Sequence, residues 1–233
     1  MTSAPETAGV GATLEVAARV HAPTGTCAAA VNSTKHADTA GRHEQAGMTE
    51  NGDMEKPLIR TIGHSTRPVD ALIEMLESHG VQRLIDVRTI PKSRYNPQYN
   101  REALERSLRD SGIDYEHMSA LGGLRHPRKD SPNMGWRNQS FRGYADYMQT
   151  TEFESALNAL GEAAAHEAIV IMCAEAVPWR CHRSLISDAL TARGYRVEHI
   201  MSATKSNPHT MTSFARVEGT SVLYPASGQE SLF

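Results

Sequence analysis

The 233-residue sequence has few of the features that would indicate a secreted, membrane-spanning or metal-finger protein. It contains only three cysteines, which form neither a disulfide framework nor the CxxC pair typical of structural zinc sites. No apolar run approaches the roughly 18 residues that a membrane-spanning helix needs. The N-terminus lacks the basic segment and continuous apolar core of a secretory signal. We therefore expect a protein of the reducing cytoplasm.

The sequence also lacks an excess of charge of one sign and the common nucleotide-binding motifs. Its 24 Lys and Arg residues are nearly balanced by 27 Asp and Glu residues, for a formal net charge of −3. No overall field attracts nucleic acid or a membrane, so a polyanion site would have to be a local basic cluster. Neither GxGxxG nor GxxxxGK[ST] occurs, which excludes a dinucleotide fingerprint and a P-loop.

The composition changes between an N-terminal tail and the rest of the chain. Residues 1–55 are rich in Ala, Thr, Gly and Ser and show no sustained periodicity, so we predict that they are disordered and that Cys27 has no chemical role. Met54 precedes the first clear strand, and an alternative translation start there stays open. Residues 56–233 are predicted to form a single α/β domain with a short C-terminal extension.

Apolar runs and helical patterns alternate regularly after the tail. The runs LIRTIGHS, VQRLIDVRTI and AIVIMCAE alternate with PVDALIEMLESHG, NREALERSLRDSG and CHRSLISDALTARG, and YRVEHIM is the last clear parallel-type strand. Asn100 is the expected N-cap of the second helix, and a hairpin is expected around Gly219. This alternation predicts a three-layer α/β/α fold with a mostly parallel, Rossmann-like sheet.

Nearly all reactive residues of the domain follow the ends of predicted strands. In a parallel α/β sheet, ligands bind outside the carboxyl ends of the strands. We therefore predict an active site at this edge, built from four groups of residues: Gly63, His64 and Ser65; Asp86, Arg88 and Arg94; Gly122, Gly123 and Arg125; and Cys173, Glu175, Arg180, Cys181, His182 and Arg183.

The arginines in this set indicate an anionic ligand. Planar guanidinium groups match the oxygens of phosphate and carboxylate, and helix N-termini add further donors. Asp86 is interpreted as the structural partner of Arg88 or Arg94, because Asp86 and Arg88 share one face of their strand. The predicted anion-binding residues are Arg88, Arg94, Arg125, Arg180, Arg183, Ser65, Gly122 and Gly123.

The candidate catalytic residues are Cys181, His64 and Glu175. Cys181 is expected near the first turn of a helix beside cationic groups, which would lower its pKa and favour a nucleophilic thiolate; an inert residue facing the sheet is the alternative. Glu175 fits either an ion pair with an arginine or a general base. His64 fits acid–base work or simple hydrogen bonding to the backbone.

A zinc site made of His64, Cys173, Cys181 and His182 is chemically allowed. It ranks second, because adjacent Cys and His residues rarely both reach one ion. Cys173 on its own is interpreted as a small core residue at the end of a buried strand. No cofactor can be assigned from these motifs.

Five of these segments, taken together, resemble a known family. TIGHS, DVRTIPKSR, YEHMSALGGLR, CAEAVPWRCHR and GYRVEHI occur in this order and look like the successive motifs of the DUF488 family of bacterial and archaeal proteins. The resemblance covers the chain from about Leu58 onward. It implies a compact α/β domain and supplies no reaction.

Two further segments suggest partners. The basic, aromatic-bearing stretch HPRKDSPNMGWRNQSFRGY fits a lid over the crevice, a strip that contacts nucleic acid, or a flexible insertion. The C-terminal QESLF is similar to the short motif with which bacterial proteins dock on the DNA sliding clamp, through Gln229, Leu232 and Phe233.

We favour an enzyme, a hydrolase or transferase, that acts on a phosphorylated or nucleotide-like substrate with Cys, His and Glu chemistry. The alternative is a non-catalytic module that binds a nucleotide or a nucleic-acid end and is recruited to replication or repair complexes by QESLF. Both hypotheses require an anionic ligand at the same edge of the sheet, and neither involves a membrane.

Overall fold

A computed structural model of the protein describes residues 56–226. The predicted disorder of residues 1–55, the absence of a role for Cys27, and the clamp-binding motif at Gln229, Leu232 and Phe233 all concern positions outside this range. No helix among the described residues is long and apolar enough to cross a membrane.

The described chain forms one six-stranded sheet, one small hairpin and the helices that surround them. The sheet has the strand order β3-β2-β4-β1-β5-β6, in which the first five strands are parallel and β6 runs antiparallel to β5. The elements are β1 (Leu58–Gly63), α1 (Val69–Ser78), β2 (Arg83–Asp86), η1 (Pro97–Tyr99), α2 (Arg101–Asp110), β3 (Asp114–His117), η2 (Ser119–Leu121), α3 (Gln139–Tyr147), α4 (Thr151–His166), β4 (Ile169–Cys173), η3 (Pro178–Arg180), α5 (Arg183–Ala192), β5 (Arg196–Ser202), β6 (Lys205–Pro208), β7 (Arg216–Glu218) and β8 (Ser221–Leu223).

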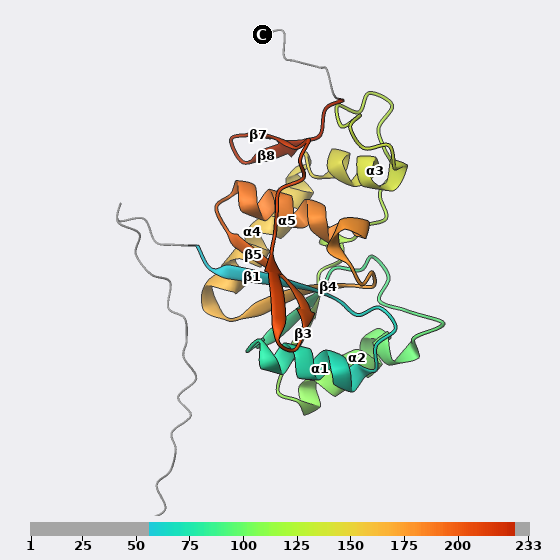
Figure 1. The fold of residues 1–233 in the computed structure, drawn as a ribbon. Coiled ribbons are helices and arrows are strands. Elements are labelled where there is room, and N and C mark those ends of the chain that lie inside the picture. The colour runs from blue at the N-terminus through green and yellow to red at the C-terminus, as the bar shows by residue number, and fades with distance from the viewer. Residues whose placement is uncertain (1–55, 227–233) are drawn as a thin grey trace, which may run out of the picture. The chain divides into compact units, whose positions relative to one another are not determined.

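Helices cover both faces of the sheet, which confirms the predicted three-layer α/β fold. Helices α1 and α2 lie on one face, and α4 and α5 lie on the other (Figure 1). Strand β4 is buried along its whole length: Ile169 and Ile171 face α4 and α5, whereas Val170 and Met172 face α1 and α2. A central parallel strand is apolar on both sides because both of its faces are covered.

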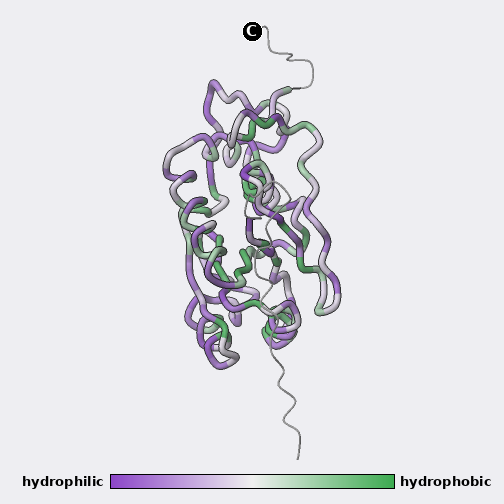
Figure 2. Tube along the Cα trace, turned by 90° about the vertical axis from the view of Figure 1, so that its left-hand side faces the viewer, coloured by the Kyte–Doolittle hydropathy of each residue, from purple (hydrophilic) through white to green (hydrophobic). Residues whose placement is uncertain are grey.

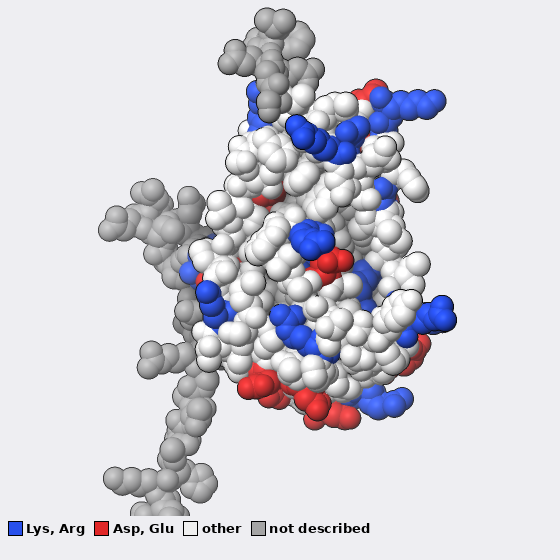
Figure 3. Space-filling model, turned by 45° about the vertical axis from the view of Figure 1, so that its right-hand side comes forward, with Lys and Arg blue, Asp and Glu red and all other residues white. Residues whose placement is uncertain are grey.

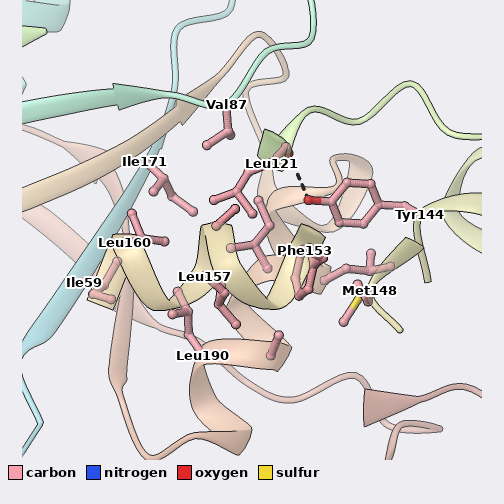
Figure 4. Close-up of a cluster of buried hydrophobic side chains, with 14 of the residues drawn as sticks. Ile59, Val87, Leu121, Tyr144, Met148, Phe153, Leu157, Leu160, Ile171 and Leu190 are labelled. Carbon is pink, nitrogen blue, oxygen red and sulfur yellow. Dashed lines mark hydrogen bonds between the residues drawn. The ribbon is translucent and has the colours of Figure 1, made fainter. Parts of the chain in front are cut away.

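The two apolar layers hold the sheet in place. Figure 2 shows hydrophobic segments running through the middle of the molecule, with hydrophilic ones around them. On the α4 side, Leu160 lies beside Ile171 and Leu157 lies beside Leu190 (Figure 4). The buried Tyr144 donates a hydrogen bond to the Leu121 carbonyl. Full burial of each such aliphatic side chain contributes about 1.5–3 kcal/mol.

The sheet has a topological switch point between β1 and β4. The chain leaves β1 toward α1 and β2, which lies beyond β4, and it leaves β4 toward α5 and β5, which lies beyond β1. The two neighbouring strands therefore send their connections to opposite sides. A crevice opens where adjacent connections diverge in this way.

Local details differ from the sequence prediction at three places. Asn100 precedes α2, but its side chain accepts a hydrogen bond from the backbone N–H of Ser93 at 2.7 Å instead of capping the helix. Helix α5 begins at Arg183, because Cys181 has extended backbone angles after η3. Strand β6 was not foreseen. The hairpin of β7 and β8 around Gly219 is confirmed.

Candidate functional site

A cavity of about 680 Å³ lies at the carboxyl ends of β1, β2 and β4, next to the switch point. Segments that are far apart in the sequence meet there, as expected for the carboxyl edge of a parallel sheet. Its lining residues are His64, Ser65, Thr66, Arg88, Thr89, Ile90, Lys92, Ser93, Asn96, Gly123, Leu124, Ser140, Phe141, Cys173, Ala174, Glu175, Ala176, Arg180, Cys181 and His182.

Two thiols and one imidazole meet in the cavity lining. The Nδ1 atom of His182 lies 3.9 Å from the Sγ atom of Cys173 and 3.7 Å from the Sγ atom of Cys181. All three ligand atoms lie within 4.8 Å of one another. The backbone is extended at Cys181 and turns into the helical region at His182, which brings the two adjacent side chains to one point. We call these three residues the thiol–imidazole cluster.

The orientation of His182 is fixed from two sides. Its Nε2 atom lies 3.1 Å from the carbonyl oxygen of Val87. A carbonyl oxygen only accepts hydrogen bonds, so Nε2 carries a proton and, in the neutral ring, Nδ1 presents a lone pair to the two sulfurs. Gly123 packs on the ring, where a Cβ atom at this position would lie 2.5 Å from Nδ1. Glycine at 123 is therefore required by close approach, and its φ is not positive.

The two thiols have opposite acidities. Their mutual hydrogen bond is the main cause: it lowers the pKa of Cys181 well below its usual range and raises the pKa of Cys173. Burial raises the pKa of both thiols, whereas the charge of Arg183 adds to the lowering at Cys181. Of the two thiols, Cys181 is therefore the one whose surroundings favour the thiolate.

Arg183 lies under the cluster as a buried cation. Its side chain is 1% exposed and has no carboxylate partner among residues 56–226. One Nη atom donates to the Thr61 hydroxyl at 3.2 Å, and the other donates to the Glu175 carbonyl. The same carbonyl explains Gly63, since a Cβ atom there would lie 1.8 Å from it. A buried guanidinium needs a nearby negative charge, and the sulfur of Cys181 can supply it.

A second polar network, which sequence reasoning missed, starts at Arg183 and runs away from the cavity. Thr61 Oγ1 lies 2.8 Å from His199 Nδ1, His199 Nε2 lies 3.0 Å from His209 Nδ1, and His209 Nε2 lies 2.8 Å from Asp188 Oδ1. Arginine only donates hydrogen bonds and a carboxylate only accepts them. In each hydrogen bond of this network, the donor is therefore the group nearer Arg183 and the acceptor is the group nearer Asp188. Burial is the main cause that lowers the pKa of His199 to about 4.

His64 and Arg88 form one unit with Asp86. Arg88 Nε lies 2.9 Å from one oxygen of the fully buried Asp86 and 3.0 Å from the other, and Asp86 also accepts from the Tyr115 hydroxyl. The structural pair predicted for Asp86 is thus formed with Arg88. His64 donates from Nδ1 to the Ser65 carbonyl and accepts from Arg88 at 3.4 Å through Nε2. Burial lowers the pKa of His64 to about 4, so the ring is neutral.

Three cations line the cavity: Arg88, Lys92 and Arg180. Lys92 was not among the predicted anion-binding residues, although it directly precedes Ser93 and Arg94 in the segment DVRTIPKSR. Arg94 is exposed and lies outside the lining. Arg125 is also outside it, because its guanidinium donates to the carbonyls of Gly122 and Ala120 and lies 3.5 Å over the Tyr147 ring.

Ser65 and Glu175 lie in the lining, whereas Gly122 does not. Ser65 has a positive φ of 52° and donates its backbone N–H to the Ala174 carbonyl, which ties the ends of β1 and β4 together. Glu175 is exposed, and its carboxylate makes no ion pair within the described part of the chain. The predicted ion pair with an arginine is therefore not formed within residues 56–226, and the role of general base stays a prediction.

Comparison with known proteins identifies the family. Residues 68–190 match the family described as "Domain of unknown function DUF488". The chain belongs to the DUF488 family. The predicted family is confirmed over residues 68–190, and this range contains the whole thiol–imidazole cluster. No curated protein and no solved structure matches the chain.

The basic segment after β3 is held in place by hydrogen bonds and by aromatic packing. The carboxylate of Asp146 accepts hydrogen bonds from the Arg128 backbone at 2.8 Å, from Ser131 at 2.6 Å and from Asn133 at 2.8 Å. Trp136 packs against Phe141, Phe214 and Tyr224. The loop is thereby pinned to α3 and to the segments around β7 and β8. Two residues of the same segment, Ser140 and Phe141, line the cavity, and the lid predicted from its composition stays a prediction.

Proposed function

We propose that the protein is an enzyme that binds a phosphorylated or nucleotide-like substrate in the cavity and transforms it at the thiol–imidazole cluster. One observation carries the proposal: reactive sulfur and nitrogen atoms share a cavity with three cationic side chains, Arg88, Lys92 and Arg180. A pocket with convergent polar groups and perturbed thiols is the expected form of a catalytic site.

The charge of the lining supports an anionic substrate. Arg88 keeps a position in the cavity although Asp86 holds its guanidinium, and the exposed Lys92 and Arg180 form no ion pair with a carboxylate of residues 56–226. Guanidinium and ammonium groups bind phosphate oxygens through charge-assisted hydrogen bonds.

The remaining lining supports a substrate with an apolar or planar part. Ile90 is 62% exposed and Leu124 is 72% exposed, and both border the cavity together with Phe141. Exposed apolar side chains beside cations suit a ligand that combines a phosphate with a base or an organic group.

The distribution of charge favours a small ligand over a nucleic-acid duplex. On the face drawn in Figure 3, Lys and Arg side chains stand as separate groups with acidic side chains among and below them. A duplex needs a continuous basic patch that neutralises several phosphates. The recruitment of the protein to a sliding clamp through QESLF stays a prediction, and a reducing compartment such as the cytoplasm would keep the two cluster thiols free.

The proposal can be tested by anion binding and by turnover. We expect inorganic phosphate and a nucleoside monophosphate to bind to the purified full-length chain in isothermal titration calorimetry. Arg180→Ala should weaken this binding by roughly tenfold, because a hydrogen bond to a charged group contributes about 1.5–3 kcal/mol. The matched control is Arg94→Ala, since Arg94 is also exposed but lies outside the lining.

Turnover of a panel of phosphate esters and nucleotides then separates the two functional hypotheses. An enzyme should release product from at least one class, and the release should be lost in Cys181→Ser. Anion binding without turnover would favour the non-catalytic binding module instead. Equal affinities of the Arg180→Ala and Arg94→Ala variants would refute the placement of the anion in this cavity.

A further inference from the structure

We propose that Cys173, Cys181 and His182 bind a zinc ion whose fourth coordination position opens into the cavity. The inference deepens the proposed function, because it assigns a cofactor to the reactive centre of the same site. In this assignment Cys181 acts as a ligand and not as a nucleophile.

The first support is the chemistry of the donors. Two cysteine sulfurs and one histidine nitrogen are a ligand set that zinc uses in catalytic sites, where three protein ligands leave one position for water or substrate. Within residues 56–226, this is the one group of three or more His, Cys, Asp and Glu side chains whose ligand atoms converge closely enough to hold an ion. His64, which the sequence analysis included in the ligand set, is not part of it.

The second support is distance. In a tetrahedral zinc site, Zn–S bonds of about 2.3 Å and Zn–N bonds of about 2.0–2.1 Å place a sulfur and a nitrogen about 3.6 Å apart. The observed separations between the sulfurs and Nδ1 of His182 are 3.7 Å and 3.9 Å. The two sulfur–nitrogen separations are therefore close to the edge lengths of a tetrahedral zinc site.

The third support is the hydrogen bond made by the second ring nitrogen of His182. Metal-binding histidines almost always donate their second ring N–H to a carbonyl or carboxylate, which fixes the tautomer and the direction of the lone pair. His182 does this with the Val87 carbonyl at 3.1 Å, and Gly123 allows the chain to close over the ring. The adjacent pair Cys181–His182 reaches one point because the backbone turns between the two residues, so the objection raised from the sequence does not hold here.

The position of the cluster explains what the ion would do. All three ligands line the cavity, so a water molecule can complete the coordination where Arg88 and Arg180 would hold an anion. Zinc lowers the pKa of bound water and makes it a nucleophile at neutral pH. In hydrolysis of a phosphate ester, the water oxygen would bond to phosphorus, the ester oxygen would leave, and the proton released by the water would end on the alcohol.

Metal content is the direct test. The full-length protein, purified without added chelator, should contain about one zinc per chain by plasma mass spectrometry. Replacement of the zinc by Co²⁺ should produce thiolate-to-metal charge-transfer bands together with the visible bands of a tetrahedral ion. Zinc content well below one per chain, with no such bands after incubation with Co²⁺, would overturn the inference.

Substitutions locate the ion. Cys173→Ser, Cys181→Ser and His182→Gln should each lower zinc affinity by at least tenfold. Cys27→Ser and His166→Gln are the matched controls, because Cys27 lies outside the cluster's segments and His166 is exposed at the end of α4. Circular dichroism checks that each variant folds. If a variant does not fold, alkylation of the wild-type thiols is measured instead. The bound zinc should protect Cys173 and Cys181 from alkylation, and a chelator should remove this protection. Thiols that are alkylated equally with and without the chelator would contradict the assignment.

The outcomes for the ion and for the proposed function are distinguishable on the same preparation. Stoichiometric zinc without binding of inorganic phosphate or a nucleotide would refute the proposed substrate class and keep the metal site. Anion binding and turnover without zinc would refute the metal site and return Cys181 to the role of nucleophile.

Discussion

Two polar groups of residues lie on either side of Arg183, and they differ in how their hydrogen-bonding capacity is used. In the network from Thr61 to Asp188, every donor meets one acceptor and the direction of each bond is fixed. In the thiol–imidazole cluster, two sulfurs and one ring nitrogen lie within 4.8 Å of one another. A satisfied network stabilises a fold, whereas converging acceptors favour binding of a cation.

The largest expected effect lies in the satisfied network. Asp188 is fully buried and accepts hydrogen bonds from His209, Thr212 and Tyr224. Asp188→Ala should lower the free energy of unfolding by about 3–5 kcal/mol, because it leaves buried donors unpaired. Urea denaturation measures the change.

Asp114→Ala is the control for this substitution, since the Asp114 side chain is 73% exposed and pairs with Arg83 at the surface. Its loss should cost no more than about 1 kcal/mol. If the two variants were equally stable, the network from Thr61 to Asp188 would contribute nothing to the fold, and the contrast between the two groups would disappear.

The next effect is a dependence of stability on pH. The pKa of His199 falls from 6.5 to about 4 on folding. Between these two pH values, the His199 imidazole is protonated in the unfolded chain and neutral in the folded chain. The contribution of His199 to the free energy of unfolding is fully present above pH 6.5 and decreases as the pH falls toward 4. At pH 5 the decrease is about 2 kcal/mol. His64 behaves in the same way.

Urea denaturation at pH 7.5 and at pH 5 gives the total decrease for the wild type. His199→Gln should remove the share of His199 and make the decrease smaller by about 2 kcal/mol. An unchanged decrease in this variant would mean that His199 titrates normally in the folded protein.

The smallest effect on the fold should come from Gly123, although the effect on the cluster is expected to be clear. A methyl group at this position would meet His182 Nδ1 at 2.5 Å and displace the ring. Gly123→Ala should therefore lower zinc affinity by about 10–100-fold, the range found when support around a metal ligand is disturbed. Competition with a chromogenic chelator measures the affinity.

Gly80→Ala is the control for the Gly123→Ala substitution. Gly80 has a φ of +64°, and a Cβ atom at this position would meet no other atom within 4 Å, so the change strains the backbone without touching the cluster. It should reduce stability by about 1 kcal/mol and leave zinc affinity unchanged. A similar loss of affinity in both variants would show that general destabilisation, and not contact with His182, is responsible.

The location of the site could be predicted from the sequence because it depends on a rule of topology. Strand and helix patterns predicted a parallel sheet, and residues such as His64, Arg88 and Cys181 follow strand ends, so they reach the same edge whatever the details of the loops. The same rule could not place Arg94 or Arg125. Whether a loop arginine enters a cavity depends on competing carbonyls, and those of Ala120 and Gly122 hold Arg125 outside it.

The second network could not be predicted, because its members share no motif. Thr61 and His199 are separated by 138 positions, and Asp188 and Tyr224 by 36. Each residue by itself looks like an ordinary member of a strand, helix or loop. The convergence of the adjacent Cys181 and His182 side chains could not be predicted either, because it depends on the turn of the backbone between the two residues.

The missing side chain of Gly63, at the end of β1, allows the loop after β4 to approach closely through the Glu175 carbonyl. Any side chain at position 63 would force the segment from 174 to 182 outward, since its Cβ atom would lie 1.8 Å from that oxygen. Cys181 and His182 would move with it. A substitution at Gly63 is therefore expected to change the geometry of the thiol–imidazole cluster without touching any of its three residues.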